Sequence, residues 1–246
     1  MRQMNQGEQD ELDALWKIES SYLNKFINVS LPLGGFTKND LIQLYLLVAC
    51  DYYNTGHNTS NIKIVEVGCW TGLSSLALAY AAKKFGGTVT CIDWFKGNEN
   101  TNLDFAGEYF DVKTIFLKNI SQFKYGNCIT LKESTSEDAV NGFEDNSLDV
   151  VFLDADHRYM HIKKDIEIWL PKVKKGGVLC GHDCEVILDE GLETIYKITK
   201  DLDIIEAIHM GVCRAVTELG GTKAIPLENN TVKESLSSAL WYYVKP

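Results

Sequence analysis

The chain has 246 residues and a formal net charge of -10, because 34 aspartate and glutamate residues outnumber 24 lysine and arginine residues. Hydrophobic residues make up 45% of the chain and charged residues 24%, a composition that excludes disordered and collagen-like proteins. The acidic balance lacks the basic footprint of a nucleic-acid-binding protein, so we expect no nucleic-acid partner.

The N-terminus and the apolar runs indicate where in the cell the protein is expected. Residues 1–13 are acidic and contain no apolar run, so the sequence predicts no secretory signal. The longest apolar stretches, residues 44–50 and 73–82, are shorter than the roughly 20 residues that cross a bilayer. We therefore expect a cytoplasmic protein without membrane contact, whose seven cysteines are reduced thiols.

Two helices are expected first. Apolar residues recur at helical spacing in the first 30 residues, which predicts an amphipathic helix whose surface offers a place for a homodimer contact. Thr37 and Asp40 have the spacing of a capping box, which predicts a second helix that continues to about Asp51. We expect residues 1–56 to form an N-terminal helical cap.

From Ile62 onward, short β-branched runs alternate with longer helical patterns, which predicts a parallel sheet with crossover helices. The strands lack polar alternation because both faces of such a sheet are covered. The expected strands are 62–67, 89–93, 128–132, 148–154, 177–180, 204–209 and 239–244, and the expected helices are 74–85, 112–125, 136–141, 159–173, 189–201 and 212–219.

A glycine loop, Gly68-Cys69-Trp70-Thr71-Gly72, lies between the first strand and an alanine-rich helix that opens at Ser74. Glycines there let the backbone approach a ligand, and the free N–H groups of a helix start favour negative charge. The loop lacks the Gly-x-Gly-x-x-Gly pattern of dinucleotide folds, and Glu66 before it would repel a pyrophosphate. Asp93 ends the second strand, where it is either a turn former or an acceptor for ribose hydroxyls.

Residues 62–184 resemble the class I S-adenosylmethionine-dependent methyltransferases. The resemblance implies an α/β, Rossmann-like, doubly wound sheet of seven strands, mostly parallel with the last strand antiparallel, in a methyltransferase domain over residues 57–246. Trp70 either covers the methionine part of the cofactor or plugs the sheet edge. The resemblance assigns the amino-acid part of S-adenosylmethionine to Glu66, Gly68, Gly72 and Ser74, the ribose to Asp93, and the adenine to Trp94, Glu133 and Ser134.

Two further blocks, residues 149–159 and 176–183, resemble small O-methyltransferases of the macrocin-type and cephalosporin-hydroxylase-like group. Asp154 follows the fourth strand, while His182 and Asp183 follow the fifth, so they are expected to meet at the carboxyl edge of the sheet beside the cofactor. Asp154, His182 and Asp183 are the expected metal ligands, and oxygen ligands there suit Mg²⁺. As an alternative, His182 would orient Asp183, contact the substrate or bind a different metal such as Mn²⁺. The alternative is that these polar residues line a metal-free pocket.

His157, three residues after Asp154, is the expected general base for a hydroxyl proton. His57, His161 and His209 have no partner visible in the sequence, and we expect them to be structural or solvated. Zinc bound by Cys180, His182, Asp183 and Cys184 is disfavoured, because Cys180 is expected inside a buried strand and no second Cys-x-x-Cys or His pair completes four ligands.

The sequence therefore predicts methyl transfer from S-adenosylmethionine to a hydroxyl of a small molecule of sugar, phenol or natural-product type, assisted by a divalent metal. The alternatives are a metal-independent methyltransferase for another atom and a non-catalytic S-adenosylmethionine-binding protein. The long segments 95–111 and 185–203 leave the carboxyl edge of the sheet and are candidates for substrate selection.

Overall fold

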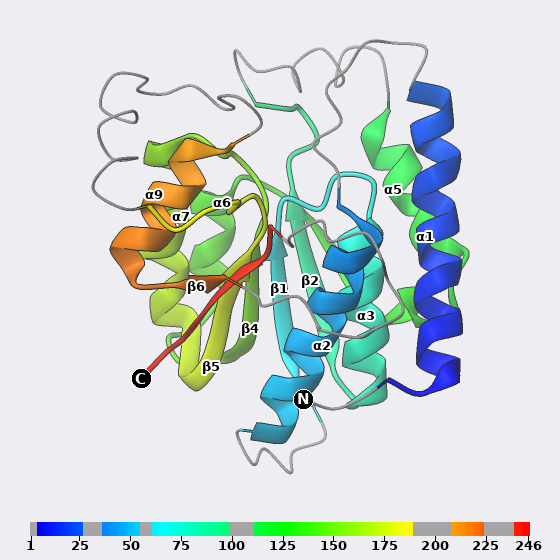
Figure 1. Ribbon diagram of the computed structural model, residues 1–246, viewed down its shortest axis with the longest axis horizontal. Helices are drawn as coiled ribbons and strands as arrows, with labels where there is room; N and C mark the ends of the chain where they lie inside the picture. Colours follow the sequence, from blue (N-terminus) through cyan, green and yellow to red (C-terminus); the bar gives the residue numbers. More distant parts are fainter. Residues whose placement is uncertain (1–3, 27–35, 55–60, 99–110, 189–207, 224–238) are drawn as a thin grey trace.

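The computed structural model describes residues 4–26, 36–54, 61–98, 111–188, 208–223 and 239–246 (Figure 1). The helices are α1 (Gln6–Phe26), α2 (Lys38–Asn54), α3 (Leu73–Lys84), α5 (Val112–Ser121), α6 (Ser136–Ala139), α7 (Tyr159–Trp169) and α9 (Met210–Leu219). The strands are β1 (Lys63–Val67), β2 (Thr88–Asp93), β3 (Ile129–Glu133), β4 (Leu148–Leu153), β5 (Val173–Gly181), β6 (Thr222–Lys223) and β7 (Trp241–Val244).

The strands form one sheet in the order β3-β2-β1-β4-β5-β7-β6. Strands β1 to β5 are parallel to their neighbours, and β7 runs antiparallel to β5. The expected mostly parallel Rossmann-like sheet with an antiparallel last strand is therefore confirmed. The six strands β1–β5 and β7 make up nearly all of it, because β6 is only two residues long and pairs with the edge strand β7.

Helices cover both faces of the sheet, with α1, α2 and α3 on one side and α6, α7 and α9 on the other (Figure 1). Along β1, Ile64 contributes to the core under α3, whereas Val65 and Val67 contribute to the core under α7 and α9. Successive side chains on a strand point to opposite faces, so a strand buried on both faces must be apolar throughout. The uniformly apolar strands of the sequence follow from this arrangement.

The N-terminal helices belong to the core of the sheet rather than to a separate body. Leu12 of α1 and Leu44 of α2 are fully buried in the cluster that contains α3. The buried Glu8 of α1 accepts a hydrogen bond from Tyr45 of α2 (2.7 Å) and pairs with Lys84 of α3. The boundary expected between residues 56 and 57 lies outside the described residues.

The capping box at the start of α2 is confirmed. The Asp40 carboxylate accepts hydrogen bonds from the backbone N–H and the hydroxyl of Thr37 (2.8 and 2.7 Å), and the Asp40 N–H donates to the Thr37 hydroxyl (3.1 Å). Asp40 also accepts from the N–H of Ala239 (3.2 Å), just before β7. One carboxylate thus ties the residue before α2 to the residues before β7.

Several expected elements have other bounds than the observed ones. Helix α7 ends at Trp169 instead of residue 173, because Pro171 cannot supply the N–H that would continue it. Strand β5 begins earlier than expected, at Val173, which pairs with Leu148. Of the strand expected at 204–209, only Ile208 and His209 are described; Ile208 forms an isolated bridge, and the short strand beside β7 is β6.

The helix expected at 189–201 lies outside the described residues. Among the helices of the described ranges, none combines the length and the apolar character that crossing a membrane requires.

Candidate active site

A cavity of about 500 Å³ opens at the carboxyl ends of β1, β2, β4 and β5. Its wall includes the glycine loop after β1, Asp93 at the end of β2, the segment after β4 from Asp154 to Arg158, and His182 and Asp183 after β5. This is where the chain order of the sheet reverses, the usual ligand-binding position in open α/β sheets. The structure thus brings together residues from four strand ends, as expected.

The glycine loop passes directly over the end of β4. Gly68 has a φ of 82°, and a Cβ on it would lie 2.1 Å from the carbonyl oxygen of Asp154. Gly72 is the N-cap of α3 with a φ of 91°, and a Cβ there would lie 3.0 Å from the Phe116 ring. Of these two glycines, Gly68 lines the cavity, whereas Gly72 does not and faces Phe116. Trp70 also lines the cavity, at its exposed rim.

Asp93 holds the glycine loop in place. Its Oδ2 accepts hydrogen bonds from the N–H groups of Cys69 and Trp70 (both 2.9 Å), and its Oδ1 accepts one from the N–H of Phe95 (2.8 Å). Burial raises the pKa of Asp93, while these backbone donors oppose the shift. A carboxylate offers about four acceptor positions, so three are already used and about one remains for a ligand hydroxyl. Asp93 therefore fits one ribose hydroxyl better than two.

Glu66 does not lie where the sequence analysis placed it. It is fully buried on the α3 face of β1, does not line the cavity, and accepts hydrogen bonds from Ser74, Ser75 and Cys91. Burial raises the pKa of Glu66 to about 7, against the opposing effect of these three donors. The physical reason is that side chains alternate between the two faces of a strand. Val65 and Val67 face α7 and α9, so Glu66 between them faces α3. Glu66 anchors the first turn of α3 and is not positioned as a cofactor contact.

The residues expected around adenine divide in the same way. Trp94 and Ser134 line the cavity. Glu133, at the end of β3, is half exposed and forms a 2.5 Å ion pair with Lys113 of α5 outside the cavity. Glu133 ends its strand one position before the cavity wall, so its side chain points away from the wall that Ser134 forms. Ser74 lines the cavity, but its hydroxyl donates to Glu66.

The expected catalytic residues converge at the other end of the cavity. His157 Nε2 lies 3.0 Å from Asp183 Oδ2 and 3.7 Å from Asp154 Oδ1. Burial raises the pKa of Asp154. Asp183 is also buried, which opposes ionisation, but the imidazoles of His157, His182 and His209 hold its pKa well below the usual range. Asp183 is consequently an ionised carboxylate at neutral pH that can orient an imidazole.

The expected metal ligands fit a divalent cation only in part. Atoms of Asp154, His182 and Asp183 lie within 4.8 Å of one another. However, His182 Nδ1 lies 3.0 Å from Asp183 and His182 Nε2 lies 3.4 Å from Asp40. Burial disfavours the charged ring, yet the two carboxylates raise the pKa of His182 well above its usual value. A protonated imidazole cannot bind a metal, so the carboxylates of Asp154 and Asp183 are the members of this set that suit Mg²⁺.

Three residues of the site were not found from the sequence. Phe36 lines the cavity and stacks on the His182 ring, with centroids 4.4 Å apart. Asp40, expected only as a helix cap, also faces His182. His209, expected to be structural or solvated, is buried at the N-terminus of α9, 3.4 Å from Asp183. No local pattern marks these residues, because each reaches the site from a distant part of the chain.

Of the segments proposed for substrate selection, the structure describes residues 95–98, Asp111 and residues 185–188. Phe95 and Asn98 line the cavity. The aromatic residues Phe105, Tyr109 and Phe110 of the first segment lie outside the described residues.

Comparison with known proteins agrees with this geometry. Residues 65–184, which contain the glycine loop, Asp93, Asp154 and Asp183, match the model of a family described as "Methyltransferase domain". This segment is similar to the methyltransferase domains of that family. The match runs from within β1 to the residues just after β5, so it includes His157 but neither the N-terminal helices nor His209.

Three individual similarities extend the comparison. The chain is 29% identical over 126 residues to the uncharacterized protein y4gI of Sinorhizobium fredii. The aligned segment covers 50% of this chain but only 13% of that protein. A Staphylococcus aureus structure described as a caffeoyl-CoA O-methyltransferase has a TM-score of 0.55 and 18% identity, covering 98% of this chain and 100% of that one. The cofactor-bound Rv0187 structure from MTB has a TM-score of 0.52 and 12% identity, covering 97% and 89%. At these identities the two structures show a shared fold.

Proposed function

We propose that this protein transfers the methyl group of S-adenosylmethionine to a hydroxyl group of a small molecule, with His157 as the general base. The observation that carries the proposal is the 3.0 Å contact between His157 and the ionised Asp183 at the cavity wall. An imidazole held by a carboxylate is a common arrangement for removing a proton from a hydroxyl. The resemblance to macrocin-type enzymes and the O-methyltransferase description of the S. aureus structure support the same acceptor atom.

The chain's own residues divide the work between the two ends of the cavity. When bound, S-adenosylmethionine supplies an electrophilic methyl group on a positively charged sulfur. The glycine loop gives the cofactor close access to the backbone, and the remaining acceptor position of Asp93 binds a ribose hydroxyl. Trp94 and Ser134 border the adenine, and Asp154 lies beside Gly68, where the two ends of the cavity meet.

The proton is handled at His157. We assign its Nε2–H as the donor to Asp183, which leaves the lone pair on Nδ1 to accept the hydroxyl proton. The imidazolium that forms is stabilised by Asp183 at 3.0 Å and Asp154 at 3.7 Å. A divalent cation held by Asp154 and Asp183 would lower the pKa of the acceptor hydroxyl. Phe36 and Trp70 provide apolar surface for a sugar or phenol ring.

The test is a binding titration followed by a turnover screen. Titration with S-adenosylhomocysteine, with Mg²⁺ and with a chelator, establishes the cofactor site. A screen of hydroxylated sugars and phenols, with products located by mass spectrometry, identifies the acceptor atom. His157→Ala should then lower kcat by about 10²- to 10⁴-fold without changing the affinity for S-adenosylhomocysteine.

His161→Ala is the matched control, because His161 also lines the cavity but is half exposed and lies 3.8 Å from Asp156 rather than beside Asp183. It should keep its activity. Methylation of nitrogen or carbon in the products, or full activity of His157→Ala, would contradict the proposal.

A further inference from the structure

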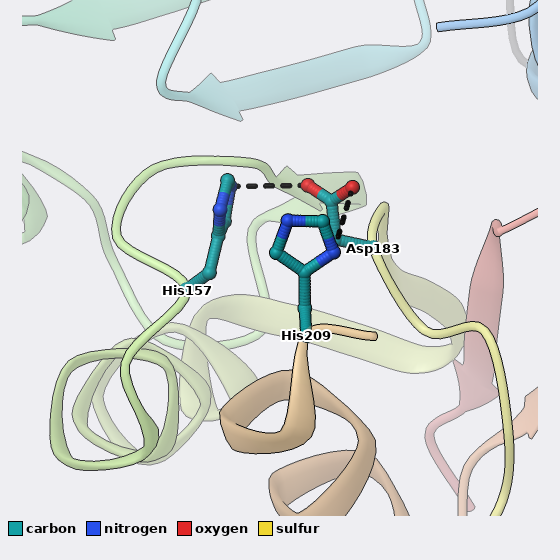
Figure 2. Close-up of side chains that lie close together, drawn as sticks. All are labelled: His157, Asp183 and His209. Atoms are coloured by element: carbon teal, nitrogen blue, oxygen red, sulfur yellow. Dashed lines mark ion pairs between the residues drawn. The ribbon is translucent and has the colours of Figure 1, made fainter. Parts of the chain in front are cut away.

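Asp183 is surrounded by three imidazoles that arrive from different parts of the chain. His182 comes from the end of β5, His157 from the segment after β4, and His209 from the N-terminus of α9. Their nitrogens lie 3.0, 3.0 and 3.4 Å from the Asp183 carboxylate. His182 Nδ1 lies 3.0 Å from Asp183, and His182 Nε2 lies 3.4 Å from Asp40. Figure 2 shows His157 and His209 beside the Asp183 carboxylate.

The three side chains in Figure 2 have the spacing of a metal site. One ligand atom from each of His157, Asp183 and His209 lies within 4.8 Å of the other two. Two ligands of a tetrahedral zinc ion, each with a bond of about 2.1 Å, are separated by about 3.4 Å. The distance between His157 Nε2 and Asp183 Oδ2 is 3.0 Å. A cation can therefore replace the proton between them without displacing either side chain far.

Glu185 prepares His209 for this role. Its Oε1 lies 2.7 Å from His209 Nδ1, and its Oε2 accepts a hydrogen bond from the His209 backbone N–H (2.9 Å). A hydrogen bond from Nδ1–H to Glu185 assigns the lone pair of the ring to Nε2, so Nε2 is the metal-binding atom and not the Nδ1 that lies 3.4 Å from Asp183. Metal-binding histidines usually have such a carboxylate behind the ring, where it fixes the tautomer and the ring orientation.

The donor set selects the class of metal. Two imidazoles and one carboxylate suit Zn²⁺, Co²⁺ and similar transition metals, whereas Mg²⁺ prefers oxygen ligands alone. We propose that His157, Asp183 and His209 form a site for a divalent transition metal of the zinc type, which shares Asp183 with the carboxylate pair Asp154 and Asp183.

Occupancy of this site has a consequence that rests on the proposed function. A cation bound to His157 Nε2 leaves the ring proton on Nδ1. In the proposed reaction Nδ1 takes the proton of the substrate hydroxyl, and a protonated Nδ1 cannot do so. The same cation occupies Asp183. Binding of a transition metal is therefore inhibitory, while the site itself is independent of which reaction the protein catalyses.

The experiment is a titration of the full chain with Zn²⁺ under reducing conditions, followed by calorimetry, and a parallel titration with Co²⁺ followed by absorption. The test variant is His209→Asn, because the asparagine amide keeps a donor near the position of Nδ1 and asparagine is a favourable residue before a helix. The control is His161→Asn, at a half-exposed histidine on α7 outside the trio.

We expect one equivalent of Zn²⁺ to bind to the natural protein and to His161→Asn with equal affinity, and at least about tenfold more weakly to His209→Asn. The Co²⁺ spectrum should show nitrogen and oxygen ligands. Absence of stoichiometric Zn²⁺ binding, unchanged affinity in a folded His209→Asn, or a thiolate-to-cobalt band from Cys184 or Cys213 would overturn the proposal. Failure of S-adenosylhomocysteine binding, in contrast, would remove the proposed function and leave this site standing.

Discussion

Replacing Asp93 by asparagine separates its two roles, in the glycine loop and towards the cofactor. The carboxylate already accepts three backbone hydrogen bonds, at 2.8 to 2.9 Å, so about one acceptor position is left for a ribose hydroxyl. A hydrogen bond to a charged acceptor contributes about 1.5–3 kcal/mol, which corresponds to roughly ten- to hundredfold in affinity. Asp93→Asn should lower the affinity for S-adenosylhomocysteine by that factor.

The same substitution should also cost stability. The asparagine oxygen can replace only one carboxylate oxygen, so its amide nitrogen must face a backbone N–H of Cys69, Trp70 or Phe95. Leaving that donor unpaired costs about 1–3 kcal/mol. Calorimetry measures the affinity, and urea unfolding measures the stability.

Asp111→Asn serves as the control, because Asp111 caps α5 at an exposed position and asparagine caps helices equally well. It removes the same charge and should change neither quantity. If folded Asp93→Asn binds S-adenosylhomocysteine within about threefold of the natural protein, well short of the expected loss, the assignment of the ribose to Asp93 is wrong.

Three further substitutions test other parts of the structure. The folded state raises the pKa of Glu66 from 4.5 to about 7, so it holds more protons than the unfolded state between these values, and stability falls as pH rises through that window. Glu66→Gln should remove about 3 kcal/mol of this pH dependence in urea unfolding and leave S-adenosylhomocysteine affinity intact; a fall in affinity would restore Glu66 as a cofactor contact. Gly68→Ala should prevent stable folding or cofactor binding, because its Cβ would lie 2.1 Å from a carbonyl oxygen, whereas Gly220→Ala, at a φ of 75° with nothing within 4 Å, should cost only about 1–2 kcal/mol. Equal thermal shifts in the two would refute the close-approach argument. Asp40→Ala should cost about 3–5 kcal/mol, because it leaves the charged His182 buried without one of its two carboxylates. A loss below about 1 kcal/mol in urea unfolding would show that His182 is neutral.

The sheet and its ligand edge were predictable because their signals are local. Continuous apolar runs mark strands covered on both faces, and acids directly after β4 and β5 must meet when those strands are neighbours. Asp154, His157 and Asp183 were therefore brought together correctly. The short β6 carries no comparable signal, since two residues are too few to establish a period.

Glu66 shows what an alternating strand conceals. A residue at the end of a strand can face the ligand edge or one of the covering helices, and the pattern of a fully apolar strand does not distinguish the two faces. Ser74 and Ser75, eight and nine residues later, donate hydrogen bonds to Glu66 and show that it faces α3. Their hydroxyls signal a buried acceptor only once α3 is known to lie over that face of β1.

His209 and Asp40 were missed for a different reason. Asp40 lies on the N-terminal helix α2, and His209 lies beyond β5, so each meets the residues after β4 and β5 only through tertiary packing. Single-residue patterns carry no information on such pairings. Their roles depend on where α2 and α9 dock.

The Asp40 carboxylate has a consequence for the order in which the molecule assembles. It contacts the Ala239 N–H, 199 positions away, and faces His182, while the Trp241 indole N–H donates to the His182 carbonyl oxygen (3.2 Å). Contacts of such high sequence separation form late, because a long loop must close first. A chain still emerging from the ribosome can build the β1 to β5 layer before it can finish this corner. The end of the cavity that holds His182 is thus complete only after residues 239–241 have docked, and the end that holds the glycine loop is complete earlier.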